Sequence, residues 1–97
     1  NKLVNSQMAL DFAYALYLML IQRKEVSVGE VKGIVQRWYV LSVLTGRYSS
    51  SPETKFYSDI RQINEIGVVK TLENIEAATL SDNFWNVAVV ESIPEFV

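Results

Sequence analysis

The sequence contains neither cysteine nor histidine, and their absence excludes several kinds of site. Without cysteine, the chain has no disulfide framework and no thiolate metal site. Without histidine, it lacks the commonest general base of enzymes and a frequent metal ligand. We therefore expect no catalytic site, no metal ion and no cofactor in this chain. The lack of cysteine also favours a reducing, cytoplasmic compartment.

Long hydrophobic runs are also missing, and residues that break helices are scarce. The longest strongly apolar run is Phe12 to Ile21, ten residues, whereas a transmembrane helix needs roughly 20. We interpret this run as a buried helix and expect no contact with a membrane. Only four glycines and two prolines occur in 97 residues, and no stretch reads as a linker.

Apolar residues make up 49% of the chain and charged residues 21%, which suits one folded domain with its own core. The mean hydropathy of +0.12 is high for a small domain. Some apolar surface should therefore meet a partner, either the remainder of a longer parent chain or a second copy. We predict a single helical domain over residues 1–97 that is a fragment of a longer chain.

Helix signals account for the first half of the sequence. A first helix is expected over residues 6–24, with Ser6 as its N-cap. Ser27 and Glu30 have the spacing of a capping box and predict the start of a second helix, which Gly46 would end. The expected buried stripe of this second helix follows helical spacing: Val31, Ile34, Val35, Trp38, Leu41, Ser42 and Thr45.

The second half predicts two or three further helices. Ser51, Pro52 and Glu53 are a cap, a first-turn proline and a first-turn acid, so a third helix should run from there to Gly67. Its expected inner side holds Phe56, Ile60 and Ile63, with Tyr57 beside them. A fourth helix over 68–78 would bury Val69, Leu72, Ile75 and either Ala78 or Thr79. Residues 84–97 read either as a short fifth helix or as an extended segment. The prediction is an all-α fold of four or five helices, in a bundle or an orthogonal array.

Charge is unevenly distributed along the chain. Residues 22–61 carry seven basic and four acidic side chains, whereas residues 62–97 carry one basic and six acidic ones. The middle of the chain could therefore meet an anion, which the last part would repel. Glu73 and Glu76 share a helix face and could in principle hold Mg²⁺. A solvated helix face is the favoured interpretation of this pair.

The segment from Gly46 to Lys55 is the one local cluster with chemistry in it. It combines the residues Arg47, Tyr48, Ser49 and Lys55 with the start of a helix, and such a combination can bind phosphate or nucleic acid. The alternative is a helix–helix corner in which Arg47 pairs with Asp59, and this alternative is favoured. Tyr48 is left open between a base-stacking role and a core role, while Trp38 belongs to the core stripe.

The run from Arg37 to Thr54, RWYVLSVLTGRYSSSPET, resembles the helical part of the GmrSD-type restriction family, whose amino-terminal domain is ParB-like. The resemblance is centred on residues 34–63. It implies that Trp38 anchors a helix, that Arg47-Tyr48-Ser49 forms the turn after Gly46, and that Asp59 is the partner of that turn. It also implies a role in bacterial DNA restriction. The Asp-Gly-Gln-Gln-Arg motif of the ParB-like domain and the histidines of an HNH nuclease are absent here, so catalysis would belong to other parts of the parent protein.

Two functions follow as expectations. The first is a non-catalytic accessory domain of a GmrSD-like defence protein that contacts nucleic-acid phosphate through the Arg47 turn. The second is a protein–protein interaction or dimerisation module without a nucleic-acid role.

Overall fold

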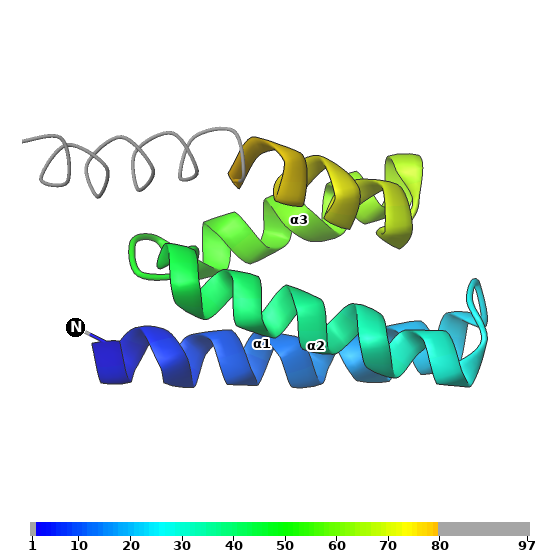
Figure 1. Ribbon diagram of the computed structural model, residues 1–97, viewed down its shortest axis with the longest axis horizontal. Helices are drawn as coiled ribbons and strands as arrows, with labels where there is room; N and C mark the ends of the chain where they lie inside the picture. Colours follow the sequence, from blue (N-terminus) through cyan, green and yellow to red (C-terminus); the bar gives the residue numbers. More distant parts are fainter. Residues whose placement is uncertain (1, 80–97) are drawn as a thin grey trace, which may run out of the picture.

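The chain forms an all-α bundle, as predicted. The computed structural model describes residues 2–79, and for residues 2–5 the backbone alone. Three helices, α1 (Lys2–Arg23), α2 (Val28–Thr45) and α3 (Pro52–Ile66), are followed by a fourth helical segment, residues 68–79. In Figure 1, α2 returns alongside α1, and α3 and residues 68–79 lie above this pair of helices. The predicted alternatives for residues 84–97 lie outside the described residues.

The first helix begins earlier than its sequence signals indicate. It starts at Lys2, so Ser6 lies inside α1 and does not cap it, which corrects the expected start. Helix growth is cooperative and costs little once a helix exists, so a serine without a breaker beside it does not stop the helix. The helix ends at Arg23, and Lys24 takes a left-handed conformation with φ 58°. A tight connection of four residues then leads into α2.

The ends of α2 are those that the sequence predicts. The amide N–H of Glu30 donates to Ser27 Oγ at 3.4 Å, and Ser27 Oγ donates to Glu30 Oε1 at 2.9 Å. Gly46 ends the helix in the left-handed conformation with φ 63°. The next amide, that of Arg47, donates to the carbonyl of Ser42 at 3.0 Å, as expected of a glycine-terminated helix. This hydrogen bond turns the chain back toward the core.

The cap of α3 differs from the prediction. Ser51 occupies the N-cap position, but it is left-handed with φ 48° and its side chain makes no capping hydrogen bond. Pro52 follows it at the first helical position. A capping side chain needs an extended backbone at its own residue, and the left-handed Ser51 does not provide one. The helix is still closed at its start, because the amide of Lys55 donates to the Ser51 carbonyl at 3.0 Å.

The core lies where all four helical segments meet. Its buried members come from each segment: Leu16, Leu20, Val31, Ile34, Trp38, Ile63, Val68 and Leu72. Two expected core residues are instead exposed, Tyr57 at 68% and Val69 at 42%. In the last segment Val68, Thr71, Leu72 and Ile75 form the inner stripe, and Val69, one residue further round the helix than Val68, turns outward.

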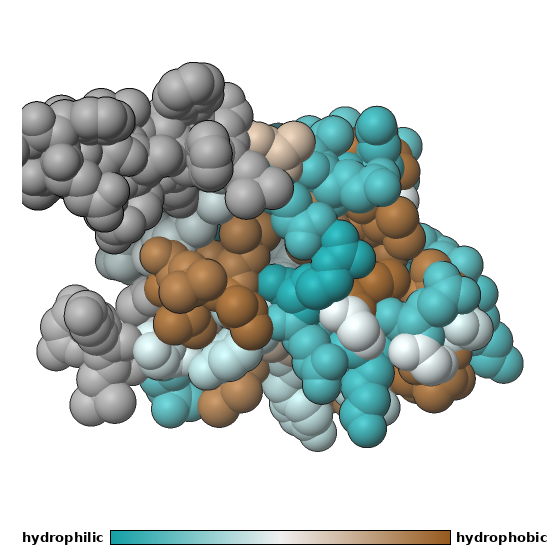
Figure 2. Space-filling view, in the orientation of Figure 1, coloured by the Kyte–Doolittle hydropathy of each residue, from teal (hydrophilic) through white to brown (hydrophobic). Residues whose placement is uncertain are grey.

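Thr45 corrects the predicted stripe of α2, because it is exposed at the helix end. Large apolar side chains also remain on the surface of α1 and α2, among them Leu10, Tyr14, Val40 and Leu44. Figure 2 shows hydrophobic atoms gathered over the C-terminal half of α2. Within residues 2–79, none of the helices combines the length and the apolar character that a membrane span requires.

Two isoleucines of α3 provide a matched test of this packing. Ile63 is buried in the core, whereas Ile66 is 42% exposed. We expect Ile63→Ala to lower the free energy of unfolding by about 2–5 kcal/mol, because it removes buried methyl groups and leaves a cavity. Ile66→Ala should cost less than about 1 kcal/mol. Urea denaturation followed by circular dichroism measures both, and equal losses would contradict the assignment of the core.

Candidate functional site

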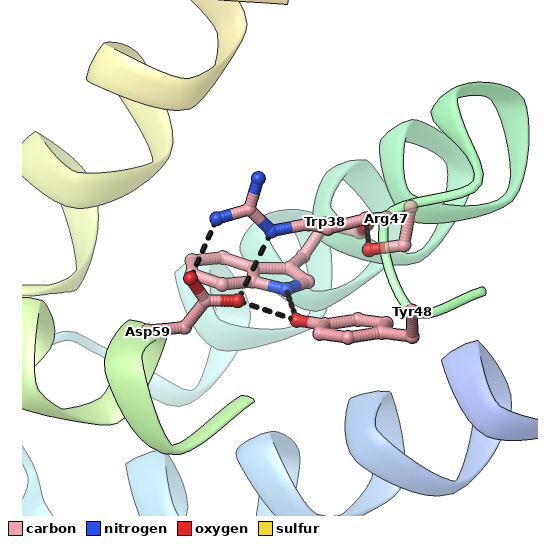
Figure 3. Close-up of polar contacts among 5 residues, drawn as sticks. Trp38, Arg47, Tyr48 and Asp59 are labelled. Atoms are coloured by element: carbon pink, nitrogen blue, oxygen red, sulfur yellow. Dashed lines mark hydrogen bonds and ion pairs between the residues drawn. The ribbon is translucent and has the colours of Figure 1, made fainter. Parts of the chain in front are cut away.

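The candidate site is the corner between α2 and α3, where four side chains form one buried polar network. Trp38 comes from the middle of α2, Arg47 and Tyr48 from the turn after Gly46, and Asp59 from the second turn of α3. Figure 3 shows all four side chains converging, with the Asp59 carboxylate between the arginine and the tyrosine. The network joins residues that are 10 to 12 positions apart in the sequence.

The Asp59 carboxylate is the centre of the network. Arg47 donates to it twice, from Nε to Oδ2 at 3.0 Å and from a terminal nitrogen to Oδ1 at 2.5 Å. Tyr48 donates from its hydroxyl to Oδ2 at 2.8 Å. Asp59 is only 3% exposed, and a buried carboxylate is stable only when it is paired and hydrogen-bonded. The three donors meet that requirement, and they confirm the predicted pair of Arg47 and Asp59.

The tyrosine hydroxyl links this ion pair to α2. It accepts a hydrogen bond of 2.8 Å from the indole N–H of Trp38 while it donates to Asp59. Both buried rings thus have their polar atoms satisfied. One helical turn further along α2, the Ser42 hydroxyl donates to the backbone carbonyl of Trp38 at 2.6 Å. The network therefore ties the middle of α2 to α3 through Tyr48.

Tyr48 is a core residue, which decides the role that the sequence left open. It is 1% exposed, and its ring meets Phe12 of α1 edge-on at 4.8 Å between centroids. Phe12 in turn stacks on Phe56 of α3 at 4.3 Å, nearly parallel. A ring enclosed in this way cannot stack on a nucleic-acid base without leaving the core. Tyr48 therefore brings α1, α2 and α3 together.

Burial and charge shift the acid–base properties of this cluster. Burial of the Tyr48 hydroxyl, and next to it the negative charge of Asp59, raise the pKa of Tyr48 well above its usual value of about 10. For Arg47, burial alone would lower the pKa, but the hydrogen bonds and charge of Asp59 outweigh it, so its pKa is raised. Arg47 is therefore charged, and Tyr48 neutral, at ordinary pH.

The two remaining predicted phosphate contacts, Ser49 and Lys55, lie at the surface. The Ser49 hydroxyl donates to the Gly46 carbonyl at 2.7 Å, which helps to close the turn, and Lys55 is exposed in the first turn of α3. Arg47 is turned inward, with its side chain 16% exposed. The four predicted contact residues thus divide into an inner pair, Arg47 and Tyr48, and an outer pair.

Three further contacts between segments were not predicted. Arg37 of α2 forms an ion pair with Glu76, so one member of the suspected carboxylate pair is bound to a cation of its own chain. Arg23 donates to the side-chain oxygen of Asn64 at 2.5 Å and thus links α1 to α3. Phe12 packs on Tyr48. No sequence spacing signals these pairs, because each joins residues that are 36 or more positions apart. Within residues 2–79, no three acidic side chains gather as a metal site would require.

Comparisons with family models, with curated proteins and with solved structures find no match to this chain. The candidate site is therefore interpreted from its own geometry. Its recorded hydrogen bonds join Trp38 to Tyr48, and both Tyr48 and Arg47 to Asp59. What the arrangement can do is hold the turn and two helices at a set angle.

Variants of two tyrosines measure how much the Tyr48 hydroxyl contributes to stability, apart from its ring. Tyr48→Phe removes the acceptor of the buried Trp38 N–H and one donor to Asp59, so we expect it to lower the free energy of unfolding by about 1–3 kcal/mol. Tyr57→Phe is the matched control, because this ring is exposed, and its change should stay within about 0.5 kcal/mol. Chemical denaturation of both variants measures the difference. Equal stabilities would mean that the hydroxyl of Tyr48 contributes nothing.

The raised pKa of Tyr48 predicts alkaline destabilisation. In the unfolded chain Tyr48 ionises near pH 10, whereas the folded protein keeps the proton, so above about pH 10 the native state binds more protons. The contribution of Tyr48 to stability is therefore complete below about pH 10 and is lost as the pH rises. Urea midpoints at increasing pH should fall more steeply for the wild type than for Tyr48→Phe. Identical slopes would contradict the prediction.

Proposed function

We propose that this chain is a non-catalytic helical accessory domain of a cytoplasmic bacterial defence protein, of the GmrSD-like type with a ParB-like domain, acting in DNA restriction. One observation carries the proposal: the residues of the resembling stretch are the residues of the buried corner network. The side chains of this network hydrogen-bond to one another, and they belong to Trp38, Arg47, Tyr48 and Asp59. A motif whose side chains bond to one another in this way maintains the geometry of the corner between α2 and α3.

A preserved shape is what an accessory domain needs. A domain that positions a catalytic neighbour must present its surface at a constant angle, and the network holds α2 against α3 at the turn where the chain changes direction. Side chains with nucleophilic or metal-binding chemistry are not required for that task. The catalytic steps of restriction would be carried by the rest of the parent protein.

Contact with nucleic-acid phosphate is the second part of the proposal, and it now rests on the outer pair. Lys55 is exposed in the first turn of α3, where the helix dipole is positive, and Ser49 lies in the turn before it. Arg47 lies below the surface and adds positive charge there, but it forms an ion pair with Asp59. An exposed lysine near a helix start is a usual partner for a phosphate group.

A second candidate is an interaction or dimerisation module without a nucleic-acid role. The apolar side chains on the surface of α1 and α2 favour it, since a monomeric domain of this size seldom exposes so many. The two proposals use different surfaces of the same fold, so they can be tested separately.

Lysine variants test the phosphate contact. We expect the chain to bind short duplex DNA with an affinity that falls steeply with salt. Lys55→Ala should weaken binding and reduce the slope of log affinity against log salt by about one unit. Lys32→Ala, an exposed lysine on α2, is the matched control because it changes the net charge equally and should have little effect. Fluorescence anisotropy over a salt series measures both variants.

Either of two results would count against this proposal. Binding that both lysine variants weaken equally would mean a diffuse charge effect, and binding that neither weakens would remove Lys55 as a contact. The accessory role has its own check in the encoding gene, where we expect a ParB-like segment with an Asp-Gly-Gln-Gln-Arg motif in the same reading frame. Without such a segment, the interaction module becomes the better proposal.

A further inference from the structure

No described residue covers one face of α2, which stays exposed along the whole helix. Gly29, Gly33, Gln36, Val40 and Leu44 follow one another at intervals of three or four residues, so they lie on one side of the helix and are called here the α2 stripe. All five are exposed, Val40 to 52% and Leu44 to 79%. The stripe is smooth at its N-terminal end, where the glycines lie, and projects large apolar side chains at its C-terminal end. Figure 2 shows the apolar end as a hydrophobic area.

Nothing within the described part of this chain requires the two glycines. Neither has a positive φ, and a Cβ atom built at either position meets no other atom within 4 Å. Glycine inside a helix is unfavourable compared with alanine, because it loses more conformational freedom on folding. The usual benefit that offsets this cost is the close approach of another backbone or side chain.

We propose that the α2 stripe is the interface of an antiparallel homodimer. In this dimer a twofold axis passes between Gln36 and Arg37. Two residues that face each other across the axis then have numbers with the same sum as 36 and 37. Leu44 then faces the partner's Gly29, and Val40 faces the partner's Gly33. Each large apolar side chain meets a gap left by a glycine, and the same contacts occur twice, as an isologous interface requires.

The charges near this axis are compatible with the pairing. Arg37 would lie close to its own copy in the partner, which would be unfavourable for two bare cations. Arg37 is, however, paired with Glu76 of its own chain. The dimer therefore brings two positive and two negative groups together at the axis. Each arginine can also face the partner's Glu76, so the charges are complementary across the interface.

The surface beside the stripe has room for a second helix. A shallow groove of about 330 Å³ lies along the C-terminal half of the stripe and is lined by Gln36, Val40, Leu41 and Leu44 together with the Arg37–Glu76 pair. The stripe spans 15 residue steps, roughly 22 Å of helix. Interfaces of standard size bury about 800 Å² per partner, so the contact must extend from the stripe into this groove and the second one. That second groove, on the α1 side, is lined by Leu10, Tyr14 and Tyr39.

The first test is the association state of the chain by analytical ultracentrifugation. We expect a dimer. Leu44→Glu should raise the dissociation constant on the order of 100-fold or more, because it puts a charge against the partner's helix. Val28→Glu is the matched control, since Val28 is equally apolar and 68% exposed on α2 but lies off the stripe, and it should leave the dimer intact.

A substitution that fills the gap at a glycine distinguishes loss of the dimer from loss of the fold. Gly33→Leu occupies the space that receives the partner's Val40, so it should produce monomers. The same change removes a helix-interior glycine, so thermal unfolding followed by circular dichroism should show a monomer with undiminished helicity. The register has its own check: Leu44→Glu combined with Gly29→Lys in one chain places opposite charges face to face and should restore the dimer.

A chain that stays monomeric up to millimolar concentration would overturn this inference. A dimer that survives both Leu44→Glu and Gly33→Leu would overturn it too. A dimer that is lost with Val28→Glu as readily as with Leu44→Glu would likewise exclude the α2 stripe as the interface. These outcomes are independent of DNA binding, because Lys55 and Ser49 lie outside the stripe.

Discussion

The fold depends on how one buried carboxylate is satisfied. Taking Asp59 out of water costs several kcal/mol, and the protein offsets this with two hydrogen bonds from Arg47 and one from Tyr48. Such a cluster is costly to break from one side, since the loss of one partner leaves the other charge buried and unpaired. It is also directional, which apolar contacts are not. The core brings the helices together, and the network selects one angle between α2 and α3.

The burial of this network also determines which residues of the corner remain exposed. Arg47 and Tyr48 point into the interior, so of the four predicted contact residues Ser49 and Lys55 remain at the surface. The exposed apolar residues lie elsewhere, on α2 and the outer side of α1. The predicted contact residues of the corner and the α2 stripe thus consist of different residues of the same domain. The proposed nucleic-acid contact and the proposed dimer interface therefore use different residues.

Local signals in the sequence were reliable where they act over a few residues. Ser27 with Glu30 and Gly46 at the end of α2 do what their spacing predicts, because a capping hydrogen bond or a left-handed glycine needs no distant partner. Signals that depend on the backbone conformation or on the packing of helices were less reliable. Ser51 makes no capping hydrogen bond because its backbone is left-handed and not extended, and Val69 lies outside the core because the inner stripe of its helix runs through Val68.

By itself the sequence determined the all-α class, most of the helix ends and the pairing of Arg47 with Asp59, because propensity, capping and opposite charge are readable from short segments. The role of Tyr48 was decided by the tertiary structure alone. Its burial depends on Phe12, 36 positions earlier, and its two hydrogen bonds depend on Trp38 and Asp59 in different helices. The uncovered face of α2 was also decided there. Whether a glycine or a leucine of a helix faces a neighbour is set by how the helices pack, which no local pattern encodes.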